Sequence, residues 1–295
     1  SVADQRAVFD NKLLPYLLVL PQMVIVGLFF LWPGFQALVL SLFREDAFGT
    51  RREFVGLENF ARLFASDAYL NSMQVTFLFS FWVMVISISV ALYLAVLADR
   101  AVKGSKAYTT LLIWPYAVAP AVSGVMWMFL FNPTVGVISY GLDFLGYDWN
   151  HALRRTHGFL LVTVAASWRQ IAYNFLFFLA GLQSIPPSLI ESAAIDGAKP
   201  RSRFWRIVFP LLSPTTFFLV IMNIMYSFFL TFGIIHQVTQ GGPNQATNIL
   251  VYKVYRDGFV NLNLGSSSAQ SVVLMAIVIA LTFIQFRFFE RKVHY

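Results

Sequence analysis

Long apolar stretches without charged residues dominate the chain. Five of them contain no Asp, Glu, Lys or Arg, namely residues 13–43, 68–98, 107–142, 207–252 and 258–286. A sixth stretch, 156–190, is interrupted only by Arg169. A helix that crosses a bilayer needs about 20 mainly apolar residues. Trimming the polar ends therefore predicts six membrane-spanning helices, at residues 14–40, 73–97, 108–131, 159–183, 211–235 and 267–288.

The composition supports this interpretation. Hydrophobic residues make up 58% of the chain, charged residues only 12%, and the mean hydropathy is +0.67. A soluble domain carries about 25% charged residues. We therefore predict an all-α integral membrane protein in which residues 1–295 form one transmembrane domain. The first apolar stretch is too long for the core of a signal peptide, and a chain without cysteine offers no disulfide or cysteine–metal chemistry.

The distribution of basic residues predicts the orientation in the membrane. If the N-terminus is cytoplasmic, residues 1–12, 98–107, 184–210 and 287–295 face the cytoplasm and carry 12 of the 21 Lys and Arg residues. The outer segments carry eight, including Arg44, Arg51 and Arg52. The positive-inside rule favours this arrangement, with both termini cytoplasmic. Basic residues placed in this way fix topology and meet anionic lipid, so the net charge of +7 does not indicate nucleic-acid binding.

Three outer loops and several prolines add local expectations. Residues 44–72 are expected to form a short, partly helical cap, 132–158 to turn repeatedly, and 236–264 to turn at the sequence Gln240–Asn244. Prolines remove backbone donors that lipid cannot replace, so kinks are expected in the first and third spans. Such kinks serve either packing or gating. The prolines concerned are Pro15, Pro21, Pro33, Pro115 and Pro120.

The cytoplasmic segment 184–210 is predicted to form an elbow. Ser188 and Glu191 have the spacing of a capping box, which predicts a short helix over residues 189–196. Gly197 is well placed to end this helix. A second short helix over 201–209 is expected to end at Pro210.

The first elbow helix has small residues that permit close approach by another backbone, at Ala193, Ala194, Gly197 and Ala198. Glu191 and Asp196 could pair with basic groups of a partner. From the residues alone, an ordinary inter-helix turn is an equally good interpretation. A catalytic role for the two carboxylates is less attractive, because no histidine is near them.

The same segment resembles the coupling signature, or EAA loop, of binding-protein-dependent ABC importer permeases. The matching residues are Glu191, Ser192, Ala193, Ala194, Asp196, Gly197, Ala198, Ile207 and Pro210. Ser192 replaces the usual Ala, and Phe209 replaces the usual Leu. The resemblance implies a type I ABC importer permease fold in which these residues couple to an ATPase.

Further segments extend the resemblance over nearly the whole chain. Those similar to the carbohydrate-import branch are 55–60, 111–120, 129–133 and 241–243. Those similar to the A-type permeases of sn-glycerol-3-phosphate importers are 147–150, 173–178, 183–186 and 271–275. The resemblance implies a bacterial inner-membrane complex with a second homologous permease, two cytoplasmic ATPases and an external binding protein. Its expected cargo is sn-glycerol 3-phosphate, and glycerophosphodiesters could also be carried.

The chain lacks the Gly-x-x-x-x-Gly-Lys-Ser/Thr sequence of ATP-binding loops. No cofactor or metal is therefore expected in this chain, and partner ATPases would bind Mg-ATP. Transport would proceed by alternating access, driven by movement of the elbow. Three alternatives stay open: a permease for a neutral sugar or oligosaccharide, an autonomous secondary transporter or channel, and a membrane enzyme.

Arg169 is the strongest candidate for the substrate pathway, because a charge inside a spanning helix faces the protein interior or water. Its guanidinium could attract a substrate phosphate. A bond to a carbonyl or to the other permease is the alternative. Other polar residues of spans four to six could line the pathway or join helices to one another. They are Gln170, Tyr173, Asn174, Asn223, Tyr226, Ser227, Ser267, Gln270 and Ser271.

Overall fold

A computed structural model describes residues 13–45, 51–99 and 105–289. These residues divide into two compact units. The first unit contains the described residues through Leu63 together with Asp257–Val272. The second contains Phe64–Arg256 and the described residues from Val273 onward. Six of the basic residues counted on the cytoplasmic side lie outside the described residues, namely Arg6, Lys12, Arg100, Lys103, Arg291 and Lys292.

The first unit begins with a continuous helical stretch and a small hairpin. Its elements are α1 (Leu14–Val26), the π-helical turn η1 (Gly27–Leu31), α2 (Trp32–Leu40), the strands β1 (Phe43–Glu45) and β2 (Arg52–Phe54), α3 (Glu58–Phe64), the π-helical turn η4 (Arg256–Val260) and the start of α15 (Leu264–Phe289). The strands are antiparallel, with Phe43 opposite Phe54. The Asn59 side-chain amide donates to the main-chain oxygens of Ser41 and Phe43, both at 2.8 Å. These bonds fasten α3 to the hairpin.

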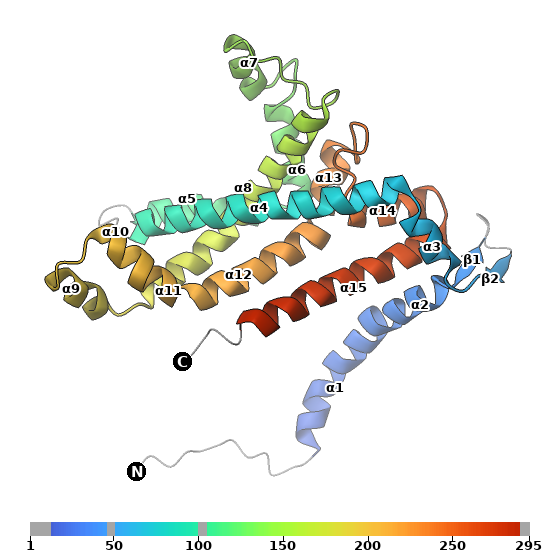
Figure 1. Cartoon of the computed structure of the whole chain (residues 1–295), viewed down its shortest axis with the longest axis horizontal. Coiled ribbons are helices and arrows are strands. Elements are labelled where there is room, and N and C mark those ends of the chain that lie inside the picture. The colour runs from blue at the N-terminus through green and yellow to red at the C-terminus, as the bar shows by residue number, and fades with distance from the viewer. Residues whose placement is uncertain (1–12, 46–50, 100–104, 290–295) are drawn as a thin grey trace. The chain divides into compact units, whose positions relative to one another are not determined.

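The second unit holds the remaining helices. They are α4 (Asp67–Asp99), α5 (Ser105–Ala117), α6 (Pro120–Leu130), α7 (Val137–Phe144), α8 (Arg155–Gln183), α9 (Pro187–Ile195), α10 (Pro200–Arg203), η2 (Phe204–Val208), α11 (Phe209–Leu211), α12 (Ser213–Met225), η3 (Tyr226–Leu230), α13 (Phe232–Val238) and α14 (Leu250–Tyr255). Helices α4 and α8 run side by side, α12 packs against both, and α6 packs against α13 (Figure 1).

A line of small, buried side chains runs along α4. Ser72, Thr76, Ser87, Ala91 and Ala95 are all fully buried and recur at helical spacing. Small residues let membrane helices pack closely. The hydroxyls of Ser72 and Thr76 donate to carbonyls one turn earlier, at 3.0 and 2.7 Å, so their burial leaves no polar group without a partner.

The large apolar side chains fill the space that the small ones leave. Phe79 and Val83 pack with Leu161 and Val162 near one end of the helix pair, and Phe175 and Phe178 pack with the alanines of α4 near the other. The core of the second unit therefore consists of two clusters along the α4–α8 pair.

The prediction of an all-α membrane protein is confirmed in its main features. Within the described residues, four continuous helical stretches are long and apolar enough to cross a membrane, at Leu14–Leu40, Asp67–Asp99, Ser213–Leu230 and Leu264–Arg287. The pair Ala107–Ala117 and Pro120–Leu130, bent by 102°, would make a fifth span. The remaining predicted span, the fourth at 159–183, corresponds to α8, which has 29 residues but falls short in apolar character, since it carries Arg169, Gln170 and Asn174.

The predictions for the outer loops and the kinks are confirmed in part. The cap at 44–72 contains the β1–β2 hairpin in addition to helix, and the loop at 132–158 contains α7 in addition to turns. The turn at Gln240–Asn244 is confirmed, because Gln240, Gly241 and Asn244 all adopt positive φ. The expected kink in the third span is confirmed as the break before Pro120.

Candidate functional site

Arg169 lies midway along α8 and contacts the break between α5 and α6. Its Nε donates to the main-chain oxygen of Val118 over 3.0 Å. Val118 belongs to neither helix, and no main-chain N–H of the described residues donates to its oxygen. The arginine therefore satisfies a carbonyl that the broken span leaves without a helical partner.

Two tyrosine rings surround the same guanidinium. The Arg169 Cζ lies 5.1 Å from the ring centre of Tyr116 and 5.9 Å from that of Tyr226, which are cation–π distances. Tyr116 also packs against Tyr173, with ring centres 5.4 Å apart. Arg169 and Tyr173 are half-buried and Tyr116 is exposed, whereas Tyr226 is buried and donates to the Ala166 oxygen over 3.2 Å. Tyr116 was not among the predicted pathway residues; it lies two residues before Val118, in the last turn of α5.

A second group of predicted pathway residues joins α8 to α12. The side-chain amides of Asn174 and Asn223 bond reciprocally, at 3.3 and 2.9 Å, and both residues are fully buried. Asn223 Nδ2 also donates to the Leu219 oxygen at 2.7 Å. The Ser227 hydroxyl donates to the Asn223 oxygen at 2.8 Å, and Gln170 is buried nearby in sequence on α8. This geometry matches interhelical bonding, which was the alternative to a pathway role.

Three predicted pathway residues lie on α15 in the first unit. Ser267 and Gln270 are buried and Ser271 is half-buried. Gln270 Nε2 donates to the Asp257 carboxylate at 2.5 Å and to the Ser266 hydroxyl at 3.2 Å. Ser267 packs tightly under Gly258, where an added Cβ would lie 2.6 Å from the serine hydroxyl. These contacts fasten η4 to the beginning of α15.

The first helix of the elbow, α9, begins at a different residue than predicted but ends where it was predicted to end. Helix α9 begins at Pro187 with Pro186 as its N-cap and has no side-chain cap bond, so the capping box of Ser188 and Glu191 is wrong. The paired prolines start the helix earlier than expected, because proline suits the first helical position. Pro210 was expected to end the second helix but lies within α11.

Gly197 ends α9 as predicted. Its φ is +79°, its N–H donates to the Ala194 oxygen at 3.1 Å, and the Ala198 N–H donates to the Ala193 oxygen at 3.0 Å. This is the Schellman motif, which requires a left-handed residue at that position. Helix α9 has no buried residue, and Ile195 at its end is 87% exposed. Helix α9 is therefore left largely uncovered by the other described residues.

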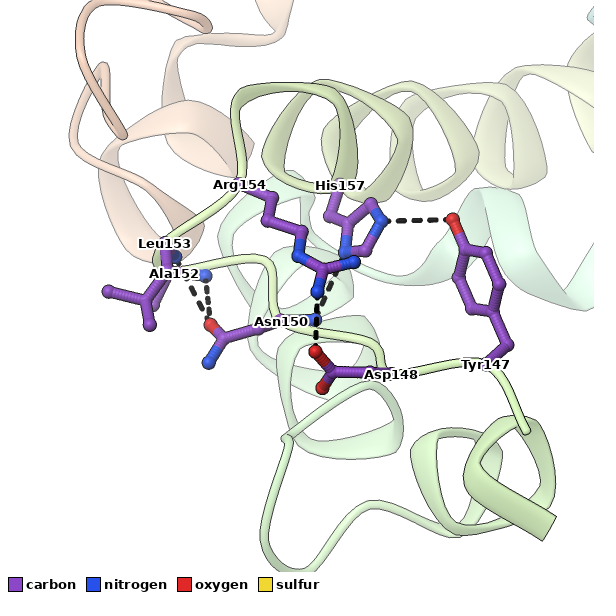
Figure 2. A network of polar contacts seen from close by, with 7 residues as sticks. All are labelled: Tyr147, Asp148, Asn150, Ala152, Leu153, Arg154 and His157. Carbon is purple, nitrogen blue, oxygen red and sulfur yellow. Dashed lines mark hydrogen bonds and ion pairs between the residues drawn. The ribbon is translucent and has the colours of Figure 1, made fainter.

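A polar network orders the segment that leads into α8 (Figure 2). His157 Nδ1 accepts the Asn150 main-chain N–H at 3.0 Å, and Nε2 lies 2.9 Å from the Tyr147 hydroxyl. The His157 ring stacks on Trp149, with centres 4.5 Å apart. Arg154 forms an ion pair with Asp148 at 2.5 Å. No sequence motif marks the pairing of Asn150 with His157, so sequence analysis missed this network.

His151, in the same segment, is buried, and its Nδ1 has no hydrogen-bond partner among the described residues. Burial lowers the pKa of His151 below its usual value, and the neighbouring His157 lowers it further, against a main-chain hydrogen bond to Phe131 that raises it. The imidazole is therefore held in its neutral form. Within the described residues, no group of three or more His, Cys, Asp or Glu side chains could hold a metal ion.

Comparison with known proteins identifies the family of this chain. The model of a family described as "Binding-protein-dependent transport system inner membrane component" matches residues 12–295. The chain belongs to this family. It is consequently a multi-pass inner-membrane permease component of an ABC transporter that works with a binding protein, and it is not an enzyme. The family assigns ATP handling to a partner ATPase.

Relatives within the family match the full chain. The chain is 60% identical over 291 residues to the "sn-glycerol-3-phosphate transport system permease protein UgpA" of Rhizobium meliloti, covering 99% of each protein. The proteins of the same name from Agrobacterium fabrum and Pectobacterium atrosepticum are 59% and 54% identical, with 99% and 100% of each protein covered.

Solved structures confirm the importer-permease fold. A chain of a bacterial ABC transporter involved in the import of the acidic polysaccharide alginate aligns with a TM-score of 0.82 at 19% identity. The alignment covers 95% of this chain and 96% of that one. A chain of the MetNI methionine ABC transporter aligns with a TM-score of 0.54 at 17% identity.

Proposed function

We propose that this chain is the translocating permease subunit of an ATP-driven importer of sn-glycerol 3-phosphate. The observation that carries the proposal is the identity of 54–60% over the full length of relatives named for this transport system. A substrate shared across such full-length identity is the simplest explanation. Glycerophosphodiesters, which carry the same phosphate and glycerol groups, are a natural extension of the cargo.

The proposed complex contains this chain, a second homologous permease, two cytoplasmic ATPases that bind Mg-ATP, and a periplasmic binding protein. Both termini of this chain face the cytoplasm. The distribution of Lys and Arg supports the orientation, because the elbow segment alone contains Lys199, Arg201, Arg203 and Arg206. The elbow then lies on the side where the ATPases operate.

The elbow is the proposed point of coupling. Residues 191–198 of the signature lie on or directly after α9, which has no buried residue, and its last two members, Ile207 and Pro210, lie in η2 and α11. The Schellman motif at Gly197 fixes the end of α9. A force applied to α9 would therefore be passed on to the residues that follow Gly197. We propose that closure of the ATPases moves α9 and opens the spans outward, and that hydrolysis resets them.

Arg169 is the proposed group for attracting the phosphate. The Nε–H of its guanidinium donates to the Val118 oxygen, and the tyrosine rings beside it carry no carboxylate that would neutralise its charge. Guanidinium geometry suits phosphate oxygens. We place the accessible part of the pathway at Arg169, Tyr173 and Tyr116. Buried polar residues beside it would hold the helices in place, namely Gln170, Asn174, Asn223, Tyr226 and Ser227. We propose that Ser267, Gln270 and Ser271 also line the pathway.

The experiment is ligand-stimulated ATP hydrolysis by the complete complex in lipid vesicles. With the binding protein present, sn-glycerol 3-phosphate should stimulate hydrolysis, whereas a neutral oligosaccharide such as maltose should not. Stimulation by maltose alone would overturn the substrate while leaving the importer intact. Failure of the chain to co-purify with any ATPase would overturn the importer itself.

A further inference from the structure

A pocket beside the elbow combines an apolar wall with a positive rim. It has a volume of about 520 Å³ and lies between the end of α4 and the second half of the elbow, formed by α10 and η2. Leu92, Tyr93 and Val96 line it from α4, Phe204 and Trp205 from η2, and Arg201 from α10. This size falls within the range of small-molecule sites in proteins.

The apolar wall continues an outward face of α4. Leu78, Trp82, Val85 and Tyr93 recur at helical spacing and are all exposed, with Tyr93 65% accessible. Apolar side chains on the outside of a membrane-spanning helix contact acyl chains. Such a face suits contact with acyl chains, and the pocket opens beside it. Tyr93 and the exposed Trp205 are residue types that concentrate at the level of lipid headgroups.

The rim carries positive charge without a neutralising partner. Arg201 is exposed, and within the described part of the chain it forms no ion pair. A neighbouring pocket of about 370 Å³ shares Val96, Pro200 and Phe204 with the first and is lined by Arg203. The Arg203 Nε is buried and has no hydrogen-bond partner among the described residues.

The two pockets differ in charge, which decides where an anion would bind. Asp99 lines the smaller pocket together with Arg203, so the charges there are mixed. Arg201 is the charged residue that lines the larger pocket. An anionic group is therefore favoured at the larger pocket, next to its apolar wall.

We infer that this pocket is a binding site for an anionic phospholipid, with the phosphate of the headgroup on Arg201 and an acyl chain against Leu92, Val96 and Phe204. Basic pockets at the membrane surface bind anionic headgroups, and each Lys or Arg near the surface contributes to the attraction. A lipid bound there contacts both α4 and the second half of the elbow. The site goes beyond substrate transport and stands independently of the cargo.

The test uses the complete complex, purified in detergent and examined by native mass spectrometry after addition of phosphatidylglycerol or phosphatidylcholine. Three variants are compared with the natural protein. Arg201→Gln removes the rim charge, Val96→Phe fills the apolar part, and Arg206→Gln is the matched control, because Arg206 is an exposed arginine nearby that does not line the pocket.

The natural protein should retain phosphatidylglycerol in preference to phosphatidylcholine. Arg201→Gln should weaken retention of phosphatidylglycerol about fivefold, Val96→Phe should abolish it, and Arg206→Gln should leave it unchanged. Equal retention of the two lipids by the natural protein would overturn the inference. So would an equal loss in Arg201→Gln and Arg206→Gln. Loss of the ATPase subunits from Arg201→Gln and Val96→Phe, with lipid retention unaltered, would instead assign the pocket to the ATPase.

Discussion

Arg169 donates from Nε to the main-chain oxygen of Val118 across 3.0 Å, which joins the middle of α8 to the break between α5 and α6. The carbonyl is free because the span bends by 102° at this point. A charged donor is therefore held beside the rings of Tyr116 and Tyr226. Proposed phosphate binding and this structural bond use the same side chain, so its substitution should affect both.

Substituting Arg169 should impair transport more than assembly. Arg169→Gln keeps a donor for Val118 but loses the charge, and we expect uptake of sn-glycerol 3-phosphate to fall at least about tenfold, the cost of a hydrogen bond to a charged group. Arg169→Lys keeps the charge and should retain more uptake. Co-purification of the partner subunits controls for assembly. Normal uptake by a fully assembled Arg169→Gln complex would remove Arg169 from the pathway.

The Asn174–Asn223 pair should behave asymmetrically in stability measurements. Asn223→Leu leaves the buried Asn174 amide without its partner, at a cost of about 1–3 kcal/mol. Asn174→Leu should cost less, because Asn223 keeps its bond to the Leu219 oxygen. Thermal unfolding of the detergent-solubilised chain measures both variants.

The double variant Asn174→Leu, Asn223→Leu is the control for that pair. It should be more stable than Asn223→Leu alone, since no buried amide is left without a partner. Additive losses from the two single substitutions would show that the amides do not act as a pair, and would reopen a pathway role for them.

Gly197 should be sensitive to side chains that resist a left-handed backbone. Gly197→Ala should destabilise the end of α9 by about 1–2 kcal/mol, because an added Cβ disfavours φ of +79°. Space is not the limiting factor, since nothing lies within 4 Å of the added atom. We expect Gly197→Ala to lower the yield of co-purified ATPase, and Gly197→Asn, which tolerates this conformation, to restore most of it. Equal yields from both variants would disconnect the motif from coupling.

The segment 147–158 should loosen in acid. The pKa of His151 is lowered by burial, so as the pH falls through about 6.5 the unfolded segment takes up a proton before the folded one does. Stability is therefore complete above that pH and declines below it. Protonation of His157 at Nδ1 would also break its bond from the Asn150 N–H. Asp148 and Arg154 face each other in the same network.

Hydrogen exchange of this segment at about pH 7.5 and pH 5.5, corrected for intrinsic rates, measures the loss. Segments of the α4–α8 core should show no comparable change. His151→Gln removes one titrating group and should flatten the pH response. An unchanged response in His151→Gln would mean that His151 does not drive the loosening.

The sequence predicted the apolar helices well because lipid imposes a simple rule on their length and composition. It also located Gly197, since a left-handed helix end favours glycine. It missed the start of α9, where two consecutive prolines outweighed the Ser188–Glu191 spacing. It could not foresee that Val118 would meet Arg169, or that Asn174 would meet Asn223, because these pairs are 51 and 49 residues apart and depend on how helices pack.

ATP-driven uptake tests the central claim most directly. The complete complex is reconstituted into vesicles, and entry of labelled sn-glycerol 3-phosphate is measured with the binding protein outside and Mg-ATP on the side of the ATPases. We predict accumulation that requires both the binding protein and hydrolysable ATP and that stops when the ATPases are omitted. Uptake driven by an ion gradient, without ATPase subunits, would contradict the account.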